Sequence, residues 1–444
     1  MKDILLSGGT LVTDGKKEVA DILVRDGRIE QISPSIQAPA SAKVIDAEGK
    51  WVLPGLIDDQ VHFREPGLTH KASIFTESRA AVAGGVTTFF EMPNVSPPTL
   101  SMEKLEEKRA IARRDSVANY AFFLGASNEN LEAVKSADPT RIAGVKIFMG
   151  SSTGNMLVDE EAVLEQIFRH APTPIATHCE DTPTILANEE AAKKKYHNDA
   201  PFWEHPNIRS REACLKSSTL ATELAKREKA RLHVLHISTA EELDLFTPGD
   251  PRITAEACVH HLWFEESSYA THGSRIKCNP AIKKESDRRA IRQAVADGRI
   301  SVLATDHAPH TWEEKQQPYF QAPSGLPLVQ HTLLLMLEMV KQNCFTLETM
   351  VERACHAPAR IFDVVDRGHI REGYWADLVL VDPNTKTVVD DTKLWSKCGW
   401  SPFAGERFSH LVEKTMVSGN LVYDGAEIRE EHRGEAVLFS PNRR

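Results

Sequence analysis

The chain has 444 residues, of which 41% are hydrophobic and 26% are charged, and its formal net charge is −10. This ordinary globular balance excludes a disordered or low-complexity chain, and the length predicts roughly two to three domains. The negative charge argues against a protein that binds nucleic acid and against a basic membrane-surface protein.

The seven cysteines form no CxxC pair and are odd in number, so we expect no disulfide framework and a reducing compartment. The opening MKDILLSGG is too short an apolar run for a signal peptide. No run of about 18 apolar residues predicts a membrane helix. We therefore expect a cytoplasmic protein.

Short predicted strands occupy both ends of the chain. Turn signals at Asp14-Gly15 and Asp26-Gly27 separate the first ones. The predicted strands are Ile4–Val12, Ile22–Val24, Arg28–Ile32 and Lys43–Ile45 near the start, and Asp377–Val381, Leu411–Val417 and Leu421–Tyr423 near the end.

The middle of the chain alternates short apolar runs with helical stretches such as Thr76–Ala83, Ser101–Arg114, Glu160–His170 and Arg209–Glu228. The runs are Val52–Ile57, Thr87–Met92, Asn119–Leu124, Val145–Met149, Pro174–Thr177, Leu232–Ile237, Arg252–Ala257 and Ser301–Thr305. Eight such runs predict a (β/α)₈ barrel. We expect an α/β protein in which residues 52–365 form the barrel, and residues 1–51 with 366–444 form a small β-sandwich.

Polar residues follow several of the predicted barrel strands, at the rim where such barrels carry their chemistry. The residues with metal-ligand chemistry are His62, His178, His236 and Asp306, with Lys146 inside the fourth strand. Imidazole and carboxylate groups suit Zn²⁺. A protonated lysine would repel the ion, so we hypothesise that Lys146 has reacted with CO₂ to form a bridging carbamate.

Each residue alone has a simpler interpretation. A single histidine in a strand is more often a hydrogen-bonded core or surface residue, Lys146 could extend to the barrel mouth, and Asp306 could cap a helix. Histidines away from strand ends, such as His197 and His205, are expected at the surface. The predicted convergence on one rim favours a metal site.

Several motifs resemble those of the dihydroorotases of the amidohydrolase superfamily across nearly the whole chain. They are LPGLID (53–58) leading to HFREPG (62–67), EMPN (91–94), KCNP (277–280), ATDHAPHT (304–311), APSG (322–325) and ADLVLVD (376–382). The resemblance implies a barrel with a β-sandwich made from both termini, which agrees with the strand count.

The same resemblance implies roles for individual residues. His62, Lys146, His178, His236 and Asp306 would bind one or two zinc ions, and Asp306 would also be the general acid/base. Those that would contact the substrate are Arg64, Asn94 and His310 at its carboxylate, and Asn279, Ser324 and Gly325 at its ring. The strand GVKIFM (144–149) is similar to the carboxylated-lysine strand of hydantoinases and allantoinases.

The chain departs from the family pattern at Gln60, because the first motif of the family is His-x-His and here reads Gln60-Val61-His62. An amide oxygen is a poorer zinc ligand than imidazole. We therefore expect the metal beside Gln60 and His62 to bind weakly or to be absent.

The implied reaction is the reversible cyclisation of N-carbamoyl-L-aspartate to L-dihydroorotate in pyrimidine biosynthesis, with a metal-bound hydroxide attacking in the ring-opening direction. Two alternatives stay open: an allantoinase or other cyclic amidase, and a non-catalytic partner of aspartate transcarbamoylase, which Gln60 motivates. We expect a small-molecule substrate, a homodimer and no nucleic-acid partner. Residues 311–325 are expected to form a mobile lid over the site.

Overall fold

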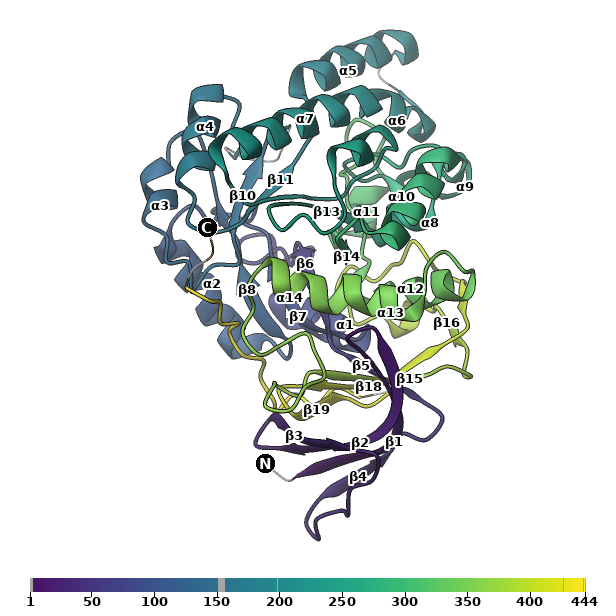
Figure 1. The fold of residues 1–444 in the computed structure, drawn as a ribbon. Helices are drawn as coiled ribbons and strands as arrows, with labels where there is room; N and C mark the ends of the chain where they lie inside the picture. Colours follow the sequence, from purple (N-terminus) through teal and green to yellow (C-terminus); the bar gives the residue numbers. More distant parts are fainter. Residues whose placement is uncertain (1–2, 151–155, 198, 426, 442, 444) are drawn as a thin grey trace.

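The computed structural model describes residues 3–150, 156–197, 199–425, 427–441 and 443, and shows a barrel above a smaller β domain (Figure 1). The parallel barrel strands are β6 (Leu56–Val61), β7 (Val86–Glu91), β8 (Asn119–Phe122) continued by β9 (Leu124–Gly125), β10 (Val145–Phe148), β11 (Ile175–His178), β12 (Leu232–Val234), β13 (Ile253–Cys258) and β14 (Val302–Ala304).

The barrel is closed by hydrogen bonds at both breaks between its two sheets. Phe123 N donates to Glu91 O at 3.1 Å, and Leu124 N donates to Gly144 O at 3.0 Å, so β8 and β9 continue one strand position. On the other side, His62 N donates to His307 O at 2.7 Å, next to a parallel bridge between Val61 and His307. The predicted (β/α)₈ fold is therefore confirmed.

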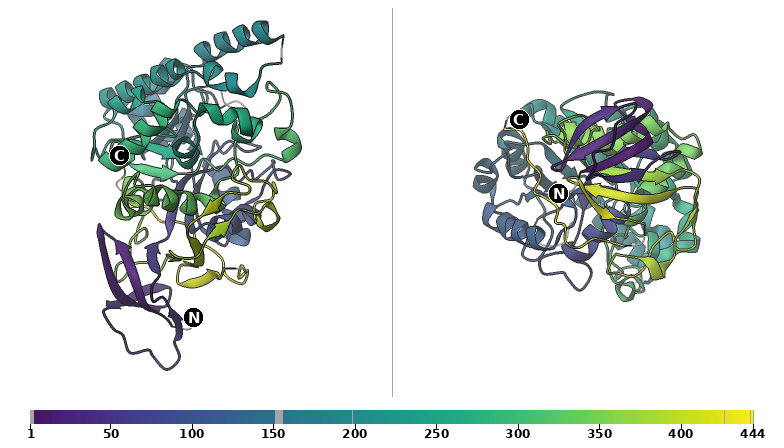
Figure 2. Two further views of the ribbon diagram at one scale, coloured as in Figure 1. Left: turned by 90° about the vertical axis from the view of Figure 1, so that its right-hand side faces the viewer. Right: turned by 90° about the horizontal axis from the view of Figure 1, so that it is seen from below.

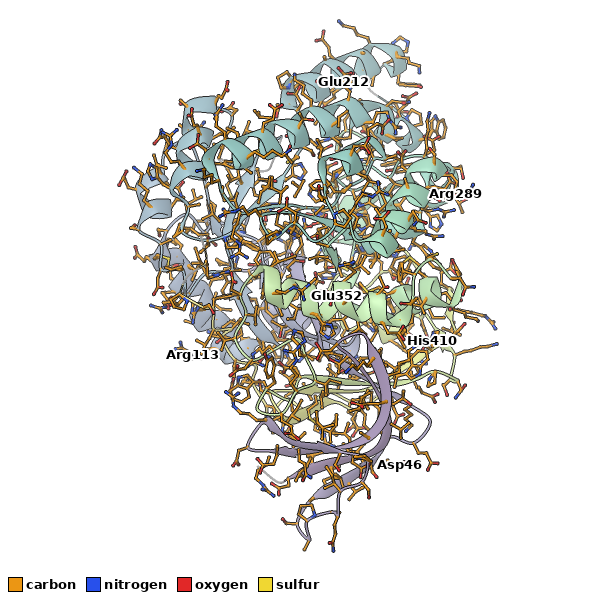
Figure 3. The ribbon with its side chains drawn as sticks, in the orientation of Figure 1. Asp46, Arg113, Glu212, Arg289, Glu352 and His410 are labelled. Atoms are coloured by element: carbon orange, nitrogen blue, oxygen red, sulfur yellow. The ribbon has the colours of Figure 1, made fainter. Side chains whose placement is uncertain are left out.

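Helices surround the barrel, with charged side chains such as Glu212 and Arg289 on their outer faces (Figure 3). They are α1 (Ile74–Ala83), α2 (Met102–Asp115), α3 (Leu131–Lys135), α4 (Glu161–His170), α5 (Thr182–Tyr196), α6 (His205–Ile208), α7 (Arg211–Glu228), α8 (Val259–Trp263), α9 (Tyr269–His272), α10 (Glu285–Asp297), α11 (Trp312–Lys315), α12 (Thr332–Lys341), α13 (Leu347–Val351) and α14 (Ala357–Ile361).

Side-chain caps explain where the longer helices begin. Ser73, Ser101, Asp181 and Ser210 each accept a hydrogen bond from a backbone N–H in the first turn of α1, α2, α5 and α7. The four helices predicted from the sequence correspond to α1, α2, α4 and α7, and their bounds agree with the structure to within two residues at each end. No helix in the described part of the chain is long and apolar enough to cross a membrane.

The β domain is one eight-stranded sheet that folds over its own core. Its strands are β1 (Ile4–Thr13), β2 (Lys16–Arg25), β3 (Arg28–Ser33), β4 (Lys43–Asp46), β5 (Trp51–Pro54), β15 (Leu378–Asp382), β18 (Leu411–Val417) and β19 (Asn420–Tyr423). Side chains from both chain ends share this core, among them Ile22, Val52, Leu380 and Met416. Figure 2 shows this purple and yellow layer below the barrel. Between β15 and β18 the chain forms a separate two-stranded sheet from β16 (Thr387–Val388) and β17 (Arg407–Phe408).

The predicted strand Val52–Ile57 is wrong, because two strands of different sheets meet there. β5 pairs with β1 and β15, whereas β6 pairs with β7. The chain changes sheets at Gly55, whose N–H donates to Asp377 O at 2.8 Å, while Leu56 N donates to Gly85 O at 3.1 Å. Glycine is required because a Cβ at this position would lie 2.1 Å from Thr87 Oγ1.

The lower end of the barrel is plugged by aromatic rings. Phe90 and Phe123 fill the bore and contact Phe362 edge-on, at ring-centroid distances of 5.4 and 5.9 Å. Phe439 of the C-terminal segment adds a ring 5.8 Å from Phe90. Val437 and Phe439 thus pack into this cluster, and the aromatic rings close this end of the barrel bore. The division into domains stays a prediction.

Candidate active site

A cavity of about 320 Å³ opens at the carboxyl ends of the barrel strands. Every site residue predicted from the sequence lines it: His62, Arg64, Asn94, Lys146, His178, His236, Asn279, Asp306, His310, Ser324 and Gly325. Gln60, Phe148, Arg209, Ala308 and Pro323 complete the lining. The structure therefore brings the predicted residues together, while their individual roles stay predictions.

His62 faces a carboxylate with a nitrogen that carries no proton. Its Nδ1 lies 2.7 Å from Asn94 Oδ1, an acceptor, so Nδ1 is the protonated nitrogen. Burial holds the pKa of His62 well below its usual value, which keeps the ring neutral. Its Nε2 lone pair then points at Asp306 Oδ1, 3.1 Å away. Two electron-pair donors at this distance fit a cation between them.

His178 and His236 form a second donor pair. His178 Nδ1 lies 2.9 Å from His236 Nε2. Burial lowers the pKa of His236 well below its usual value, so at most one proton is shared between the two nitrogens. The chemistry of both donor pairs, His62 with Asp306 and His178 with His236, fits a metal ion.

Lys146 is suited to modification rather than to an ion pair. It is 1% exposed, and its Nζ lies 4.6 Å from the centroid of the Phe148 ring. Burial lowers the pKa of Lys146 to about 8. An amine with this pKa is partly neutral at physiological pH, and the neutral amine is the form that reacts with CO₂. The predicted carbamate is therefore chemically accessible.

Asp306 sits at a strained point of the backbone, with φ at 51°. Burial raises the pKa of Asp306 to about 7. Gln60 Nε2 donates to its Oδ1 at 3.2 Å. At this position Gln60 thus presents an amide N–H to the carboxylate, whereas a metal ligand would present an oxygen.

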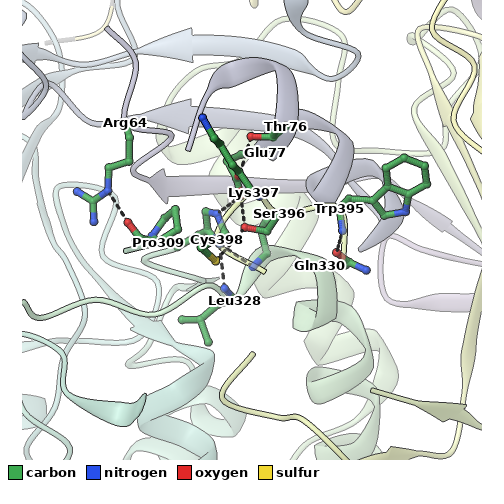
Figure 4. Close-up of polar contacts among 12 residues, drawn as sticks. Arg64, Thr76, Glu77, Pro309, Leu328, Gln330, Trp395, Ser396, Lys397 and Cys398 are labelled. Carbon is green, nitrogen blue, oxygen red and sulfur yellow. Dashed lines mark hydrogen bonds and ion pairs between the residues drawn. The ribbon is translucent and has the colours of Figure 1, made fainter. Parts of the chain in front are cut away.

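A buried network is centred on Glu77, which Figure 4 shows beside Ser396 and Lys397. His307 Nδ1 accepts from Leu328 N at 2.9 Å, so the proton is on Nε2, which donates to Glu77 Oε2 at 2.8 Å. Glu77, which is fully buried, also accepts from Ser396 Oγ at 2.6 Å and from Lys397 N at 3.0 Å. Helix α1, the end of β14 and the segment around residue 396 are therefore joined through one carboxylate.

Arg64 supplies a buried positive charge. Its Nε donates to Pro309 O at 3.0 Å, and its Nη2 lies 3.1 Å from His310 Nε2. It is 7% exposed, and in the described part of the chain no carboxylate lies within 4.0 Å of it. Burial lowers the pKa of Arg64 only to about 10, so it stays charged. A buried guanidinium without a carboxylate partner calls for an anionic ligand.

The 323–325 edge of the cavity is held in place by Lys315. Its fully buried Nζ donates to Pro323 O and Gly325 O, both at 3.0 Å, and to Lys277 O at 3.1 Å. Gly325 has a φ of 142°, and a Cβ there would lie 2.4 Å from Ala308 O. With its amide oxygen toward Arg209 Nη2 at 3.2 Å, Asn279 donates to Ser324 Oγ at 3.1 Å. The predicted lid thus includes helix α11 and an anchored edge; its mobility stays a prediction.

Two residues near the cavity were not anticipated correctly. Arg209 lines it and pairs with Glu180 at 2.8 Å, although it follows α6 and not a barrel strand. His205 was expected at the surface, but it is 1% exposed. Its Nε2 lies 2.7 Å from Cys278 O and its Nδ1 lies 2.7 Å from Tyr319 Oη. No local sequence signal marks either position, because both depend on how the excursion between β11 and β12 folds back.

Known proteins resemble this chain in sequence and in structure. The Amidohydrolase family profile matches residues 51–422. A dihydroorotase of Halobacterium salinarum is 34% identical over 417 residues, covering 92% of this chain and 96% of that protein. A dihydroorotase of Listeria monocytogenes is 31% identical, and the match covers 96% of this chain and 100% of that protein. The L-hydantoinase (dihydropyrimidinase) of Arthrobacter aurescens superposes with a TM-score of 0.91 at 26% identity, covering 97% and 98%. The chain therefore belongs to the amidohydrolase family, and the cyclic amide hydrolase expected from the sequence is confirmed.

Proposed function

We propose that this protein is a zinc-dependent dihydroorotase that interconverts N-carbamoyl-L-aspartate and L-dihydroorotate in pyrimidine biosynthesis. The observation that carries the proposal is the buried Arg64, which lines the cavity without a carboxylate partner among the described residues. Dihydroorotate has a carboxylate that a planar guanidinium can bind. The dihydroorotases at 29–34% identity support the same choice.

The resident ion would be held by His62, His178, His236, Asp306 and the carbamate of Lys146. When bound, Zn²⁺ makes water nucleophilic at neutral pH and polarises a carbonyl group. The nearly neutral rings of His62 and His236 leave their lone pairs available for this task.

The residues of the chain would divide the remaining work. Arg64 holds the substrate carboxylate, with Asn94 and His310 beside it, and so orients the ring amide toward Asp306. In ring opening, water adds to the amide carbon, the carbon–nitrogen bond breaks, and Asp306 carries the proton from the water to the departing ring nitrogen. Asn279 and the Ser324-Gly325 edge contact the ring. In the reverse direction Asp306 removes the proton from the attacking nitrogen.

The test is the rate of L-dihydroorotate ring opening by purified protein supplied with zinc and bicarbonate. We expect turnover that is lost in Asp306→Ala, and a KM for dihydroorotate at least tenfold higher in Arg64→Met, because a charged hydrogen bond contributes about 1.5–3 kcal/mol. Hydantoin, which has no carboxylate, is the control substrate.

Two results would reject the proposal. Turnover of allantoin or hydantoin but not of dihydroorotate would assign the protein to another cyclic amidase, a reading that the hydantoinase-like fold also accommodates. A folded protein that opens none of these rings would favour the non-catalytic partner of aspartate transcarbamoylase or a hydrolase of another cyclic amide. We propose the homodimer on the family resemblance alone, and its mass in solution would decide it.

A further inference from the structure

A second group of ligand-type side chains lies inside the barrel and outside the cavity lining. Asp59 comes from β6, His233 from β12 and Glu256 from β13, and all three are fully buried. One nitrogen or oxygen atom of each lies within 4.8 Å of the other two. His233 Nε2 is 3.2 Å from Asp59 Oδ2 and 3.9 Å from Glu256 Oε2.

The atoms that face one another are the ones without hydrogen bonds. Within the described part of the chain, both carboxylate oxygens of Asp59, Nε2 of His233 and Oε2 of Glu256 have no hydrogen-bond partner. Leaving buried charged groups without partners costs several kcal/mol. The ion pair between His233 and Asp59 is the closest polar contact among these atoms, and it leaves Asp59 Oδ1 and Glu256 Oε2 without a hydrogen-bond donor in the described part of the chain. These oxygens can take a ligand.

The remaining atoms of the group are anchored by neighbours. His233 Nδ1 lies 2.8 Å from Thr254 Oγ1, and Glu256 Oε1 accepts from His236 N at 3.0 Å. A metal-binding histidine typically uses its second nitrogen for such a hydrogen bond, which fixes the ring. The anchoring directs His233 Nε2 and Glu256 Oε2 toward Asp59.

We propose that Asp59, His233 and Glu256 bind a divalent transition-metal ion such as Zn²⁺. Ligand atoms about 2.1 Å from a tetrahedral ion lie roughly 3.4 Å from one another, which is close to the two distances measured here. A divalent ion neutralises both carboxylates, whereas one protonated imidazole neutralises only one. The three residues offer four atoms without a hydrogen bond, because both oxygens of Asp59 are among them, and the fully buried setting is that of a structural site.

The site would join three strands of the barrel beneath the active site. Cys258 Sγ lies 3.1 Å from Glu256 Oε1 and 3.7 Å from Gln60 Oε1, so it connects the group to the cavity wall. On the other side the Phe362 ring lies 5.5 Å from the His233 ring. The ion would therefore be inaccessible to chelators in the folded protein.

The direct test is anomalous diffraction at the zinc edge from crystals of the wild-type protein grown with zinc. We expect a peak between Asp59, His233 and Glu256, separate from any peak beside His178 and His236. A map with no peak at the buried group would overturn the proposal, and the group would be a metal-free ion pair. This result does not depend on whether the protein opens dihydroorotate.

Metal counting gives a second, independent readout. In a variant with His178→Ala and His236→Ala, about one equivalent of zinc should survive dialysis against a chelator. Adding Asp59→Asn should remove that equivalent, whereas Asp58→Asn should keep it, because the Asp58 oxygens are already bonded to Thr305. A folded double variant that retains no zinc would refute the site.

Discussion

Glu77 joins three parts of the structure, and its replacement by glutamine should destabilise the fold. In Glu77→Gln the side chain keeps its size, but one of its two oxygens becomes an NH2 group. In one orientation this group faces His307 Nε2–H and in the other it faces Lys397 N–H, and both of these are donors. One buried donor loses its partner, at about 1–3 kcal/mol, and a charged hydrogen bond becomes a neutral one. We expect the free energy of unfolding to fall by about 2–4 kcal/mol, from a typical total of about 5–15 kcal/mol.

Urea unfolding followed by circular dichroism measures this loss. The control is Glu107→Gln, because Glu107 is an exposed glutamate on the neighbouring helix α2 and should change the free energy of unfolding by less than about 0.5 kcal/mol. A loss below about 1 kcal/mol in Glu77→Gln would show that the three hydrogen bonds that Glu77 accepts from His307, Ser396 and Lys397 do not stabilise the fold as argued.

The same carboxylate gives a pH dependence with a definite sign. Although burial raises it, the hydrogen bonds from His307, Ser396 and Lys397 bring the pKa of Glu77 below its usual 4.5. A lowered pKa in the folded state contributes stability above the unfolded pKa and loses it as the pH falls through the folded pKa. The difference between wild type and Glu77→Gln should therefore be constant from pH 6 to 8 and shrink below about pH 4.5. A difference that grows on acidification would contradict this account.

Three further predictions concern the plug, the cavity edge and the metal. Phe439→Ala should lower the free energy of unfolding in urea by about 3–5 kcal/mol. Leu438→Ala is the control, because Leu438 is 63% exposed and its loss should be neutral. Equal effects would show that the Phe439 ring does not help to close the barrel. Lys315→Met leaves the carbonyls of Pro323 and Gly325 without their donor, so it should cost about 2–5 kcal/mol and speed proteolytic cleavage in residues 311–325. Lys386→Met, at an exposed position, is the control, and unchanged cleavage in Lys315→Met would refute the anchoring role. Gln60→His should raise the metal retained after dialysis, and unchanged retention would disprove the weak site.

The hydrophobic pattern determined the barrel because buried parallel strands and amphipathic helices leave a local signature. The helix starts were less exact, because the predicted helices began at Ser101 and Arg209, whereas Ser101 and Ser210 cap helices that begin at Met102 and Arg211. The pattern failed at Val52–Ile57, because an apolar run looks the same whether it enters one sheet or two. The change of sheets at Gly55 depends on the approach of Thr87, which is distant in sequence.

Some features of the candidate active site were predicted from the sequence, and others were set by the tertiary structure alone. Strand-end motifs placed His62, His178, His236 and Asp306 at one rim, because the carboxyl ends of parallel strands meet there by geometry. Only the tertiary structure decided that Arg64 is buried without a carboxylate partner among the described residues, since burial and pairing are set by residues hundreds of positions away. The same holds for Asp59, which had no recognisable partner in the sequence. Its contact with His233 and Glu256 exists only because barrel closure next to β14 brings β6 near β12 and β13.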